Sequence, residues 1–317
     1  MNFTKAERKS IKPLIGLFGE SGGGKTLSAL LLARGLVGPS GKLGMIDTEN
    51  GRGSIFSDKV PNGYEVLELN APFSPSSYVA AIEAAEEAGI ECLVIDSASH
   101  EWNGEGGYLD MKESALDRMA GNDWKKREAC KFAASAQCKP DHNRFVQRML
   151  RAKMAVILCF RAKEKVKMEK GENGKTKITS DEHVSPISET GLIFEMLIAG
   201  EVYAKDAIGG FFRCTKYTHS DIRTMLPTEG EQVGITTGER IAQWCNGGAT
   251  LSRKAQQHET AKAKCWNLVK DKVSGDTAKY RELLAKMQLI GEDTKLSDVT
   301  EEQWTTIHGQ LSAFYAQ

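Results

Sequence analysis

One short stretch of the chain has the residue types and the spacing that bind a phosphate group. Residues 19–26 read Gly-Glu-Ser-Gly-Gly-Gly-Lys-Thr, with an apolar run over 14–18 before them and a helical pattern over 25–35 after them. A strand, a glycine loop and a helix start in this order are typical of a phosphate-binding loop, or P-loop. Its backbone N–H groups and the helix N-terminus bind phosphate oxygens. The stretch predicts nucleotide binding, with an accidental glycine turn as the alternative.

The last two residues of such a loop have defined tasks. Lys25 would reach the β- and γ-phosphates of a bound nucleotide, and the hydroxyl of Thr26 would bind Mg²⁺. The residues expected to bind the nucleotide are Gly19, Glu20, Ser21, Gly22, Gly23, Gly24, Lys25 and Thr26.

An aspartate follows a later apolar run. Residues 91–95 read as a strand buried on both faces, and Asp96 comes directly after them. P-loop proteins place at this point an aspartate that holds Mg²⁺, commonly through water. We therefore predict that Asp96 and Thr26 hold the metal ion. An aspartate that only caps a strand end is the alternative.

A glutamate ends another predicted strand. Residues 42–46 are followed by Asp47-Thr48-Glu49, and the carboxyl ends of strands in an α/β sheet face the ligand. Glu49 is the predicted general base that would polarise an attacking water. The rival is Glu101, five residues after Asp96, and a solvated loop acid is the alternative for Glu49.

Two basic residues also follow predicted strands. Arg161 comes after the apolar run 154–160 and could sense the γ-phosphate, or it could be a loop arginine with a surface partner. Lys216 lies near the end of a later strand, 210–218, and could act on the nucleotide of a neighbouring subunit.

The order of the patterns predicts the fold class. Strands alternate with helices, which indicates an α/β protein with a mainly parallel sheet flanked by helices. One of these helices, over 77–88, would be capped by Ser74 or Ser76. From Leu251 glycine becomes rare and helical periodicity takes over, with predicted helices at 252–272, 276–288 and 299–315. We therefore expect an ATPase-type core over 1–248 and a small helical domain over 251–317. Its last helix begins with a capping box made by Thr300 and Gln303.

The charge of the chain limits the classes of partner. The 317 residues include 42 basic and 42 acidic ones, so a generally basic surface for nucleic acid is not indicated. A local basic patch lies in an exposed hairpin predicted over 162–182, where DNA-backbone contact and a solvated hairpin are equally open alternatives. The lysines of this patch that would contact DNA are Lys163, Lys165, Lys167, Lys175 and Lys177.

Cysteine usage and hydropathy indicate a cytoplasmic protein. Seven cysteines without CxxC spacing are typical of free thiols in a reducing compartment. The polar start of the chain lacks a signal peptide, and no apolar run approaches the roughly 18 residues of a membrane span.

Two of these motifs together resemble a known group of proteins. Asp47-Thr48-Glu49 one strand after the P-loop, then Ile95-Asp96-Ser97 one βα unit later, is similar to RecA-type recombinases. The arrangement resembles still more the phage-encoded RecA-like ATPases linked to single-strand annealing and recombination. Arg161-Ala162-Lys163 shares in the likeness, which covers about residues 12–245, although Arg161 stands where RecA has glutamine.

The resemblance carries expectations about activity and partners. It implies a RecA-like core that binds ATP and Mg²⁺, self-association into a ring or filament with ATP between subunits, and binding of single-stranded DNA in a bacterial host's cytoplasm. Residues 251–317 would dock an annealing protein or a single-strand-binding protein. Two other functions stay open: a P-loop kinase of a small molecule with 103–143 as its lid, and a nucleotide-gated packaging or scaffold component that does not touch DNA.

Overall fold

The computed structural model describes residues 5, 9–170, 176–228, 230–257, 261–270, 272–273, 276–291 and 293–315, without side chains over 165–183 and 248–264 and at 301–302. The chain divides into two units, one formed by Ser10–Asn246 and the other by Met1–Lys9 with Gly247–Gln317. Whether each predicted domain folds on its own stays a prediction.

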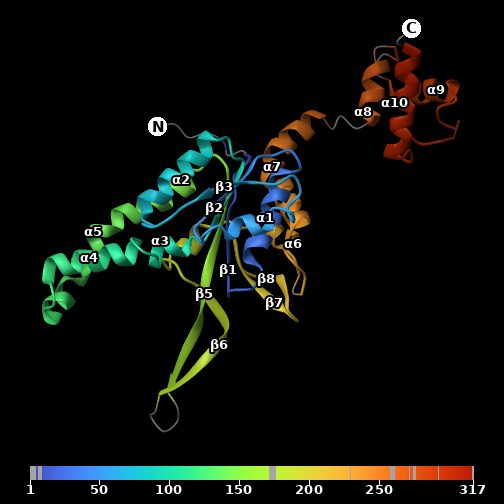
Figure 1. Ribbon diagram of the computed structural model, residues 1–317. Coiled ribbons are helices and arrows are strands. Elements are labelled where there is room, and N and C mark those ends of the chain that lie inside the picture. The colour runs from blue at the N-terminus through green and yellow to red at the C-terminus, as the bar shows by residue number, and fades with distance from the viewer. Residues whose placement is uncertain are drawn as a thin grey trace. The chain divides into compact units, whose positions relative to one another are not determined.

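A mainly parallel sheet forms the centre of the larger unit (Figure 1). Its strands follow the order β3-β2-β4-β5-β1-β7-β8, with β6 paired to β5 outside that path. The pairings along the path are parallel except the last, because β8 runs antiparallel to β7. The strands are β1 (Leu14–Gly19), β2 (Leu43–Asp47), β3 (Glu65–Glu68), β4 (Cys92–Asp96), β5 (Ala155–Lys170), β6 (Thr176–Pro186), β7 (Ile198–Lys205) and β8 (Ile208–Tyr217).

Helices cover both faces of this sheet (Figure 1). The helices of this part of the chain are α1 (Lys25–Val37), α2 (Pro75–Glu87), α3 (Ser99–Asn103), α4 (Tyr108–Ala120), α5 (Trp124–Leu150), α6 (Ser220–Met225) and α7 (Ile235–Gln257), with short 3₁₀ turns η1 (Arg52–Phe56) and η2 (Leu192–Glu195). None of the described helices combines the length and the apolar character that a membrane span needs.

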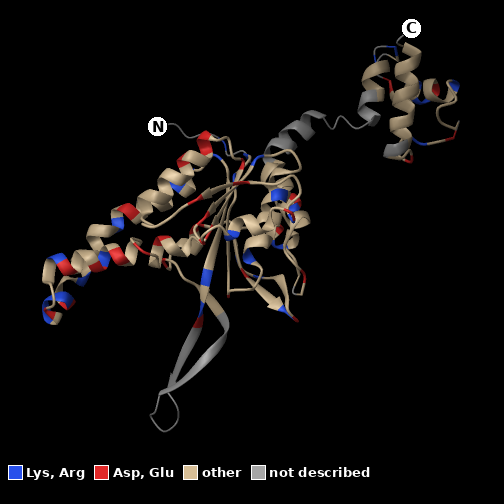
Figure 2. Cartoon of the chain, in the orientation of Figure 1, with Lys and Arg blue, Asp and Glu red and all other residues tan. Residues whose placement is uncertain are grey.

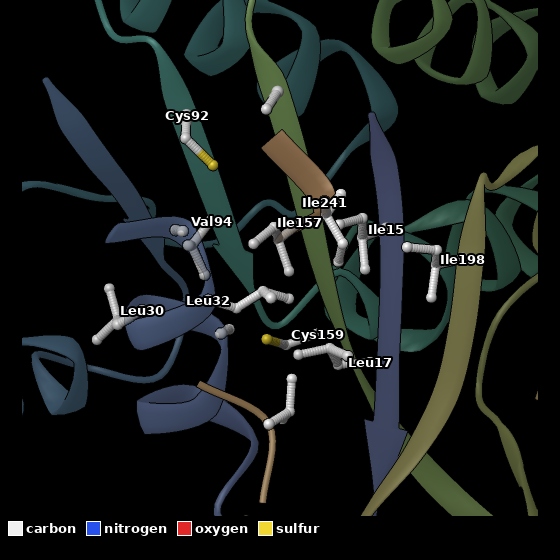
Figure 3. Close-up of a cluster of buried hydrophobic side chains, with 14 of the residues drawn as sticks. Ile15, Leu17, Leu30, Leu32, Cys92, Val94, Ile157, Cys159, Ile198 and Ile241 are labelled. Atoms are coloured by element: carbon white, nitrogen blue, oxygen red, sulfur yellow. The ribbon is translucent and has the colours of Figure 1, made fainter. Parts of the chain in front are cut away.

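The alternation of side chains along β1 shows how the two faces are built. Ile15 and Leu17 point to the face covered by α1 and α7, where they pack with residues such as Leu30 and Ile241 (Figure 3). Phe18 belongs to the opposite face, which α2 and α5 cover. Because successive strand residues face opposite sides, an all-apolar strand needs a helical layer on each side.

Two glycines bring α1 and α7 into backbone contact. A Cβ atom at Gly35 would lie 2.0 Å from the carbonyl oxygen of Ile235, and one at Gly238 would lie 2.2 Å from that of Leu32. A side chain at either position would push the helices apart.

The segment between β4 and β5 differs most from the sequence-based expectation. The sequence pattern predicts a helix only over 143–153, whereas α5 begins at Trp124 and runs through Pro140 to Leu150. Asp123 starts it early, because its carboxylate accepts hydrogen bonds from the backbone N–H groups of Lys125 and Lys126. α4 and α5 run side by side away from the sheet (Figure 1), and both carry acidic and basic residues (Figure 2).

The smaller unit has its own apolar core. Its helices are α8 (Ala261–Val269), α9 (Thr277–Lys286) and α10 (Glu301–Tyr315). Trp304 and Leu311 of α10 are buried with Tyr280 of α9. The predicted capping box is present: the N–H of Thr300 donates to Gln303 Oε1 at 2.8 Å, and the N–H of Gln303 donates to Thr300 Oγ1 at 3.4 Å.

The predicted α/β class is confirmed, with a mainly parallel sheet between helical layers and a glycine loop between β1 and α1. All seven cysteines are free thiols.

Candidate nucleotide-binding site

The predicted site residues lie at one edge of the sheet, on or directly after four neighbouring strands. Gly19 of β1 is in register with Arg161 of β5, and Asp96 of β4 is in register with Asp47 of β2. β4 and β1 both pair with β5, so these strand ends lie next to one another. Parallel pairing explains why residues distant in sequence meet at this edge.

The loop between β1 and α1 has the backbone conformation that its glycines allow. Gly22 and Gly24 have φ angles of 83° and 88°, in the left-handed region that favours glycine. The start of β8 packs against the loop, and the N–H of Gly210 donates to the carbonyl of Gly23 at 2.9 Å. A Cβ atom at Gly24 would lie 2.7 Å from the nitrogen of Gly210. The loop therefore packs directly on the first residues of β8.

The ammonium group of Lys25 lies over its own loop. Its Nζ donates to the carbonyl oxygen of Glu20 at 2.7 Å. The side chain of Glu20 is exposed, so the contact of this residue with the loop is made by its backbone. A phosphate group in the loop would offer Lys25 a stronger, charged acceptor.

Thr26 and Asp96 lie together, as predicted for a shared metal ion. The Thr26 hydroxyl donates to Asp96 Oδ2 at 2.6 Å, and Asp96 is only 6% exposed. Burial raises the pKa of Asp96 to about 6, although the Thr26 hydrogen bond lowers it. A buried carboxylate beside a hydroxyl is a donor set that suits Mg²⁺. These two residues would hold the ion, and the ion would neutralise phosphate charge.

Glu49 lies at the same edge in a pair with arginine. Its Oε1 accepts from Nε and Nη2 of Arg161 at 3.2 and 2.9 Å, and its Oε2 accepts from Nη1 of Arg52 at 3.3 Å. Burial raises the pKa of Glu49, but the hydrogen bond and charge of Arg161 outweigh it, so the net pKa is lowered. Glu49 is therefore an anion whose two oxygens both face cations.

Buried polar contacts fix the loop that carries Glu49. Asp47 accepts the N–H of Glu49 at 2.7 Å and that of Gly53 at 2.8 Å. Thr48 Oγ1 accepts the N–H of Ser97 at 2.8 Å and lies 2.7 Å from His100 Nδ1. The ends of β2 and β4 are thereby tied together, which holds Glu49 beside Asp96.

A cavity of about 860 Å³ joins these groups. It is lined by residues of the P-loop together with Asp47, Glu49 and Asp96. Its charged residues balance, with Lys25, Arg52 and Arg161 against the three acids. Leu31, Met45 and Phe56 add an apolar part that could hold a nucleotide base.

Some expectations from the sequence about residues near the site differ from the structure. Glu101 is 2% exposed and its Oε1 lies 2.9 Å from His142 Nδ1, so the rival for the general base is wrong. Arg161 does not end its strand, because β5 continues through Lys170 by pairing with β6. Among the described residues, none from 103–143 lines the cavity, so the lid of the kinase alternative stays a prediction.

Lys216 lies at the other edge of the sheet. It is in register with Ala199 near the start of β7, because β8 runs antiparallel. Its Nζ donates to the carbonyl of Phe194 at 3.2 Å. It does not reach the cavity of its own chain, and a role toward a neighbouring subunit stays a prediction.

Of the five lysines predicted to contact DNA, the structure describes the side chain of Lys163 alone. β5 and β6 pair in antiparallel, and Lys163 at the root of this pair is exposed. The side chains of Lys165, Lys167, Lys175 and Lys177 lie outside the described residues.

The sequence of the chain matches a known protein family. A family model described as an AAA domain matches residues 11–192, more than half of the chain. The chain belongs to this AAA domain family. The matched part contains the P-loop, Glu49, Asp96 and Arg161, whereas β7 and β8 lie beyond it.

The chain also resembles proteins of known structure. A KaiC-like protein from the hyperthermophilic archaeon Pyrococcus horikoshii is similar at 13% identity, over 65% of this chain and 80% of that one, with a TM-score of 0.35. No curated protein sequence matches the chain.

Sequence reasoning missed part of the AAA domain's cavity. Arg52 lies three residues after Glu49, and that spacing could have drawn attention to it. The Gly209-Gly210 pair is a turn pattern, but its contact with the P-loop depends on how β7 pairs with β1. Gln232, whose Nε2 donates to the carbonyl of Gly209 at 2.6 Å, lies in no recognisable motif.

Proposed function

We propose that this AAA domain protein binds ATP with Mg²⁺ and hydrolyses it, and that it acts as a multimer in DNA recombination or single-strand annealing. The observation that carries the ATPase part is the single cavity that combines the P-loop with Glu49 and Asp96. P-loop donors hold phosphate, and the two acids come from the ends of two separate strands that line the same cavity.

The chemistry follows from these positions. Lys25 and the loop N–H groups hold the β- and γ-phosphates, while Thr26 and Asp96 provide the metal ligands. A water oxygen forms a bond to the γ-phosphorus as the bond from that phosphorus to the β-bridging oxygen breaks, and the electron pair leaves with ADP. Glu49 accepts the proton that the water loses, and inorganic phosphate is the second product.

Two variants test the ATPase part. Lys25→Ala removes a charged donor and should weaken ATP binding roughly 10- to 100-fold, measured by calorimetric titration. Glu49→Gln should bind ATP but lower kcat by about 10²- to 10⁴-fold, because the amide cannot accept the proton. Glu87→Gln, on an exposed position of α2, is the control and should match the wild type. Normal turnover in Glu49→Gln would move the base elsewhere.

The DNA part is supported by the motif resemblance and by the exposed Lys163 where the β5–β6 pair leaves the sheet beside the cavity. Filter binding and ATP turnover, each with and without single-stranded DNA, test it. Stimulated turnover supports the recombination role. Turnover that requires a small acceptor would indicate a kinase, and unchanged turnover without DNA binding would indicate a packaging or scaffold component. Sedimentation with and without nucleotide tests the multimer.

A further inference from the structure

Arg161 pairs with one anion and lies beside the proposed site of a second. Its guanidinium pairs with Glu49 through Nε and Nη2, and it also lines the cavity that contains Lys25 and Thr26. In the sheet it is in register with Gly19, the residue that opens the P-loop. A γ-phosphate in that loop would therefore compete with the Glu49 carboxylate for the same cation.

The competition favours the phosphate. The side chain of Arg161 is 50% exposed, so its pair with Glu49 is a partly solvated contact of the kind that holds weakly. A terminal phosphate carries more negative charge and more acceptor oxygens than a carboxylate, and arginine binds it through two donors at once.

The backbone at Arg161 is fixed, so exchange needs only a change in its side chain. Its N–H donates to Ser99 Oγ at 2.9 Å, and its carbonyl accepts the N–H of Ile187 at 2.8 Å. Ser99 in turn donates to the carbonyl of Ile187 at 2.8 Å. The root of the β5–β6 pair thus stays in place while the guanidinium turns.

We propose that Arg161 is a switch that exchanges Glu49 for the γ-phosphate when a triphosphate binds. The exchange frees Oε1 of Glu49 to accept the proton of the attacking water, so Glu49 becomes a base only once a triphosphate is in place. A diphosphate leaves the pair with Glu49 intact. This regulation rests on the proposed ATPase function.

The test measures how strongly the protein prefers a triphosphate over a diphosphate. The ratio of the Kd for Mg·ADP to the Kd for a nonhydrolysable Mg·ATP analogue is determined by calorimetry for the wild type, Glu49→Gln, Arg161→Ala and the double variant. Arg144→Ala, in an exposed pair with Asp141 on α5, serves as the matched control.

The switch predicts a pattern across the four proteins. Arg161→Ala should lower the ratio about tenfold, since a charged hydrogen bond to the γ-phosphate is lost. Glu49→Gln should raise the ratio several-fold, because Arg161 no longer has to leave a carboxylate. The double variant should equal Arg161→Ala alone, and Arg144→Ala should equal the wild type.

Other results overturn the switch in different ways. A wild-type ratio in Arg161→Ala means that Arg161 does not contact the γ-phosphate. A wild-type or lower ratio in Glu49→Gln means that the two anions do not compete. A wild-type protein that binds neither nucleotide overturns the proposed ATPase function and the switch with it, which separates the two failures.

Discussion

At the scale of single residues, the two acids of the site differ in their surroundings. Asp96 is buried and contacts a neutral hydroxyl, whereas Glu49 is half-buried and contacts two guanidinium groups. The pKa of the first is accordingly raised and that of the second is lowered. The same functional group is thus prepared for two tasks, one as a ligand for a cation and one as a charged base.

Burial of Asp96 predicts a pH-dependent stability. Its folded pKa of about 6 lies above its usual value of 3.8. Between these values the folded chain holds the extra proton, so the free energy of unfolding falls as the pH rises through this window. Asp96→Asn removes the buried charge. The gain in unfolding free energy over wild type should be about 1–2 kcal/mol larger at pH 7.5 than at pH 4.5.

Urea unfolding without metal or nucleotide at the two pH values measures this difference. Asp58→Asn, an exposed acid, is the control and should show no such trend. A gain in Asp96→Asn that shrinks as the pH rises would contradict the assignment.

The sequence predicted which residues lie at the site, but it did not predict which of them contact each other. The P-loop is contiguous, and Asp96 directly follows an apolar strand, so local pattern was enough for both. The pair between Glu49 and Arg161 was not foreseen, although both residues were singled out. It joins positions 112 apart in sequence, and it exists because β5 lies between β4 and β1 in the sheet.

At the scale of secondary-structure elements, runs of apolar residues predict the buried parts of strands. The sequence predicts a strand over 154–160 and a separate exposed hairpin over 162–182, whereas β5 runs without a break from Ala155 to Lys170 and pairs with β6. The apolar pattern ends at Phe160, so it could not show that the buried strand and the first arm of the hairpin are one strand. The capping serine of α2 could be predicted from the sequence, because a cap contacts backbone groups only a few residues away in the chain.

Loss of that cap should cost stability. Ser74 is the N-cap of α2, and its Oγ accepts the N–H of Ser77 at 3.1 Å. Ser74→Ala removes this side-chain acceptor and leaves the N–H of Ser77 only its bond to the Ser74 carbonyl at 3.0 Å, so it should lower the free energy of unfolding by about 1 kcal/mol. Ser76→Ala, at the exposed neighbour, should change it by a few tenths of that amount at most. Equal losses in the two variants, measured by urea unfolding, would mean that Ser74 is not the cap.

At the scale of the whole molecule, the cavity and the apolar core of the C-terminal helices are formed by different parts of the chain. The residues that line the cavity lie between Gly19 and Val233, and the core around Trp304 draws on residues from Cys265 onward. The cavity and the C-terminal helices α8, α9 and α10 thus belong to different units of the chain.

A shortened chain tests this division. A variant that ends at Gln257 keeps α7 whole and removes α8, α9 and α10. It should bind Mg·ATP with a Kd within about twofold of the full chain, because no cavity contact is removed. Calorimetry measures the Kd, and circular dichroism with thermal melting verifies the fold. A tenfold weaker Kd in a folded variant would show that the C-terminal residues support the site.

The glycine contact between α1 and α7 has one more consequence. Two helices that touch through bare backbone cannot slide past each other or be re-spaced by changing a rotamer, so the first turns of α7 and the P-loop helix move as one body. A displacement of the start of α7 would therefore also shift α1 and the backbone amide groups of the P-loop in front of it.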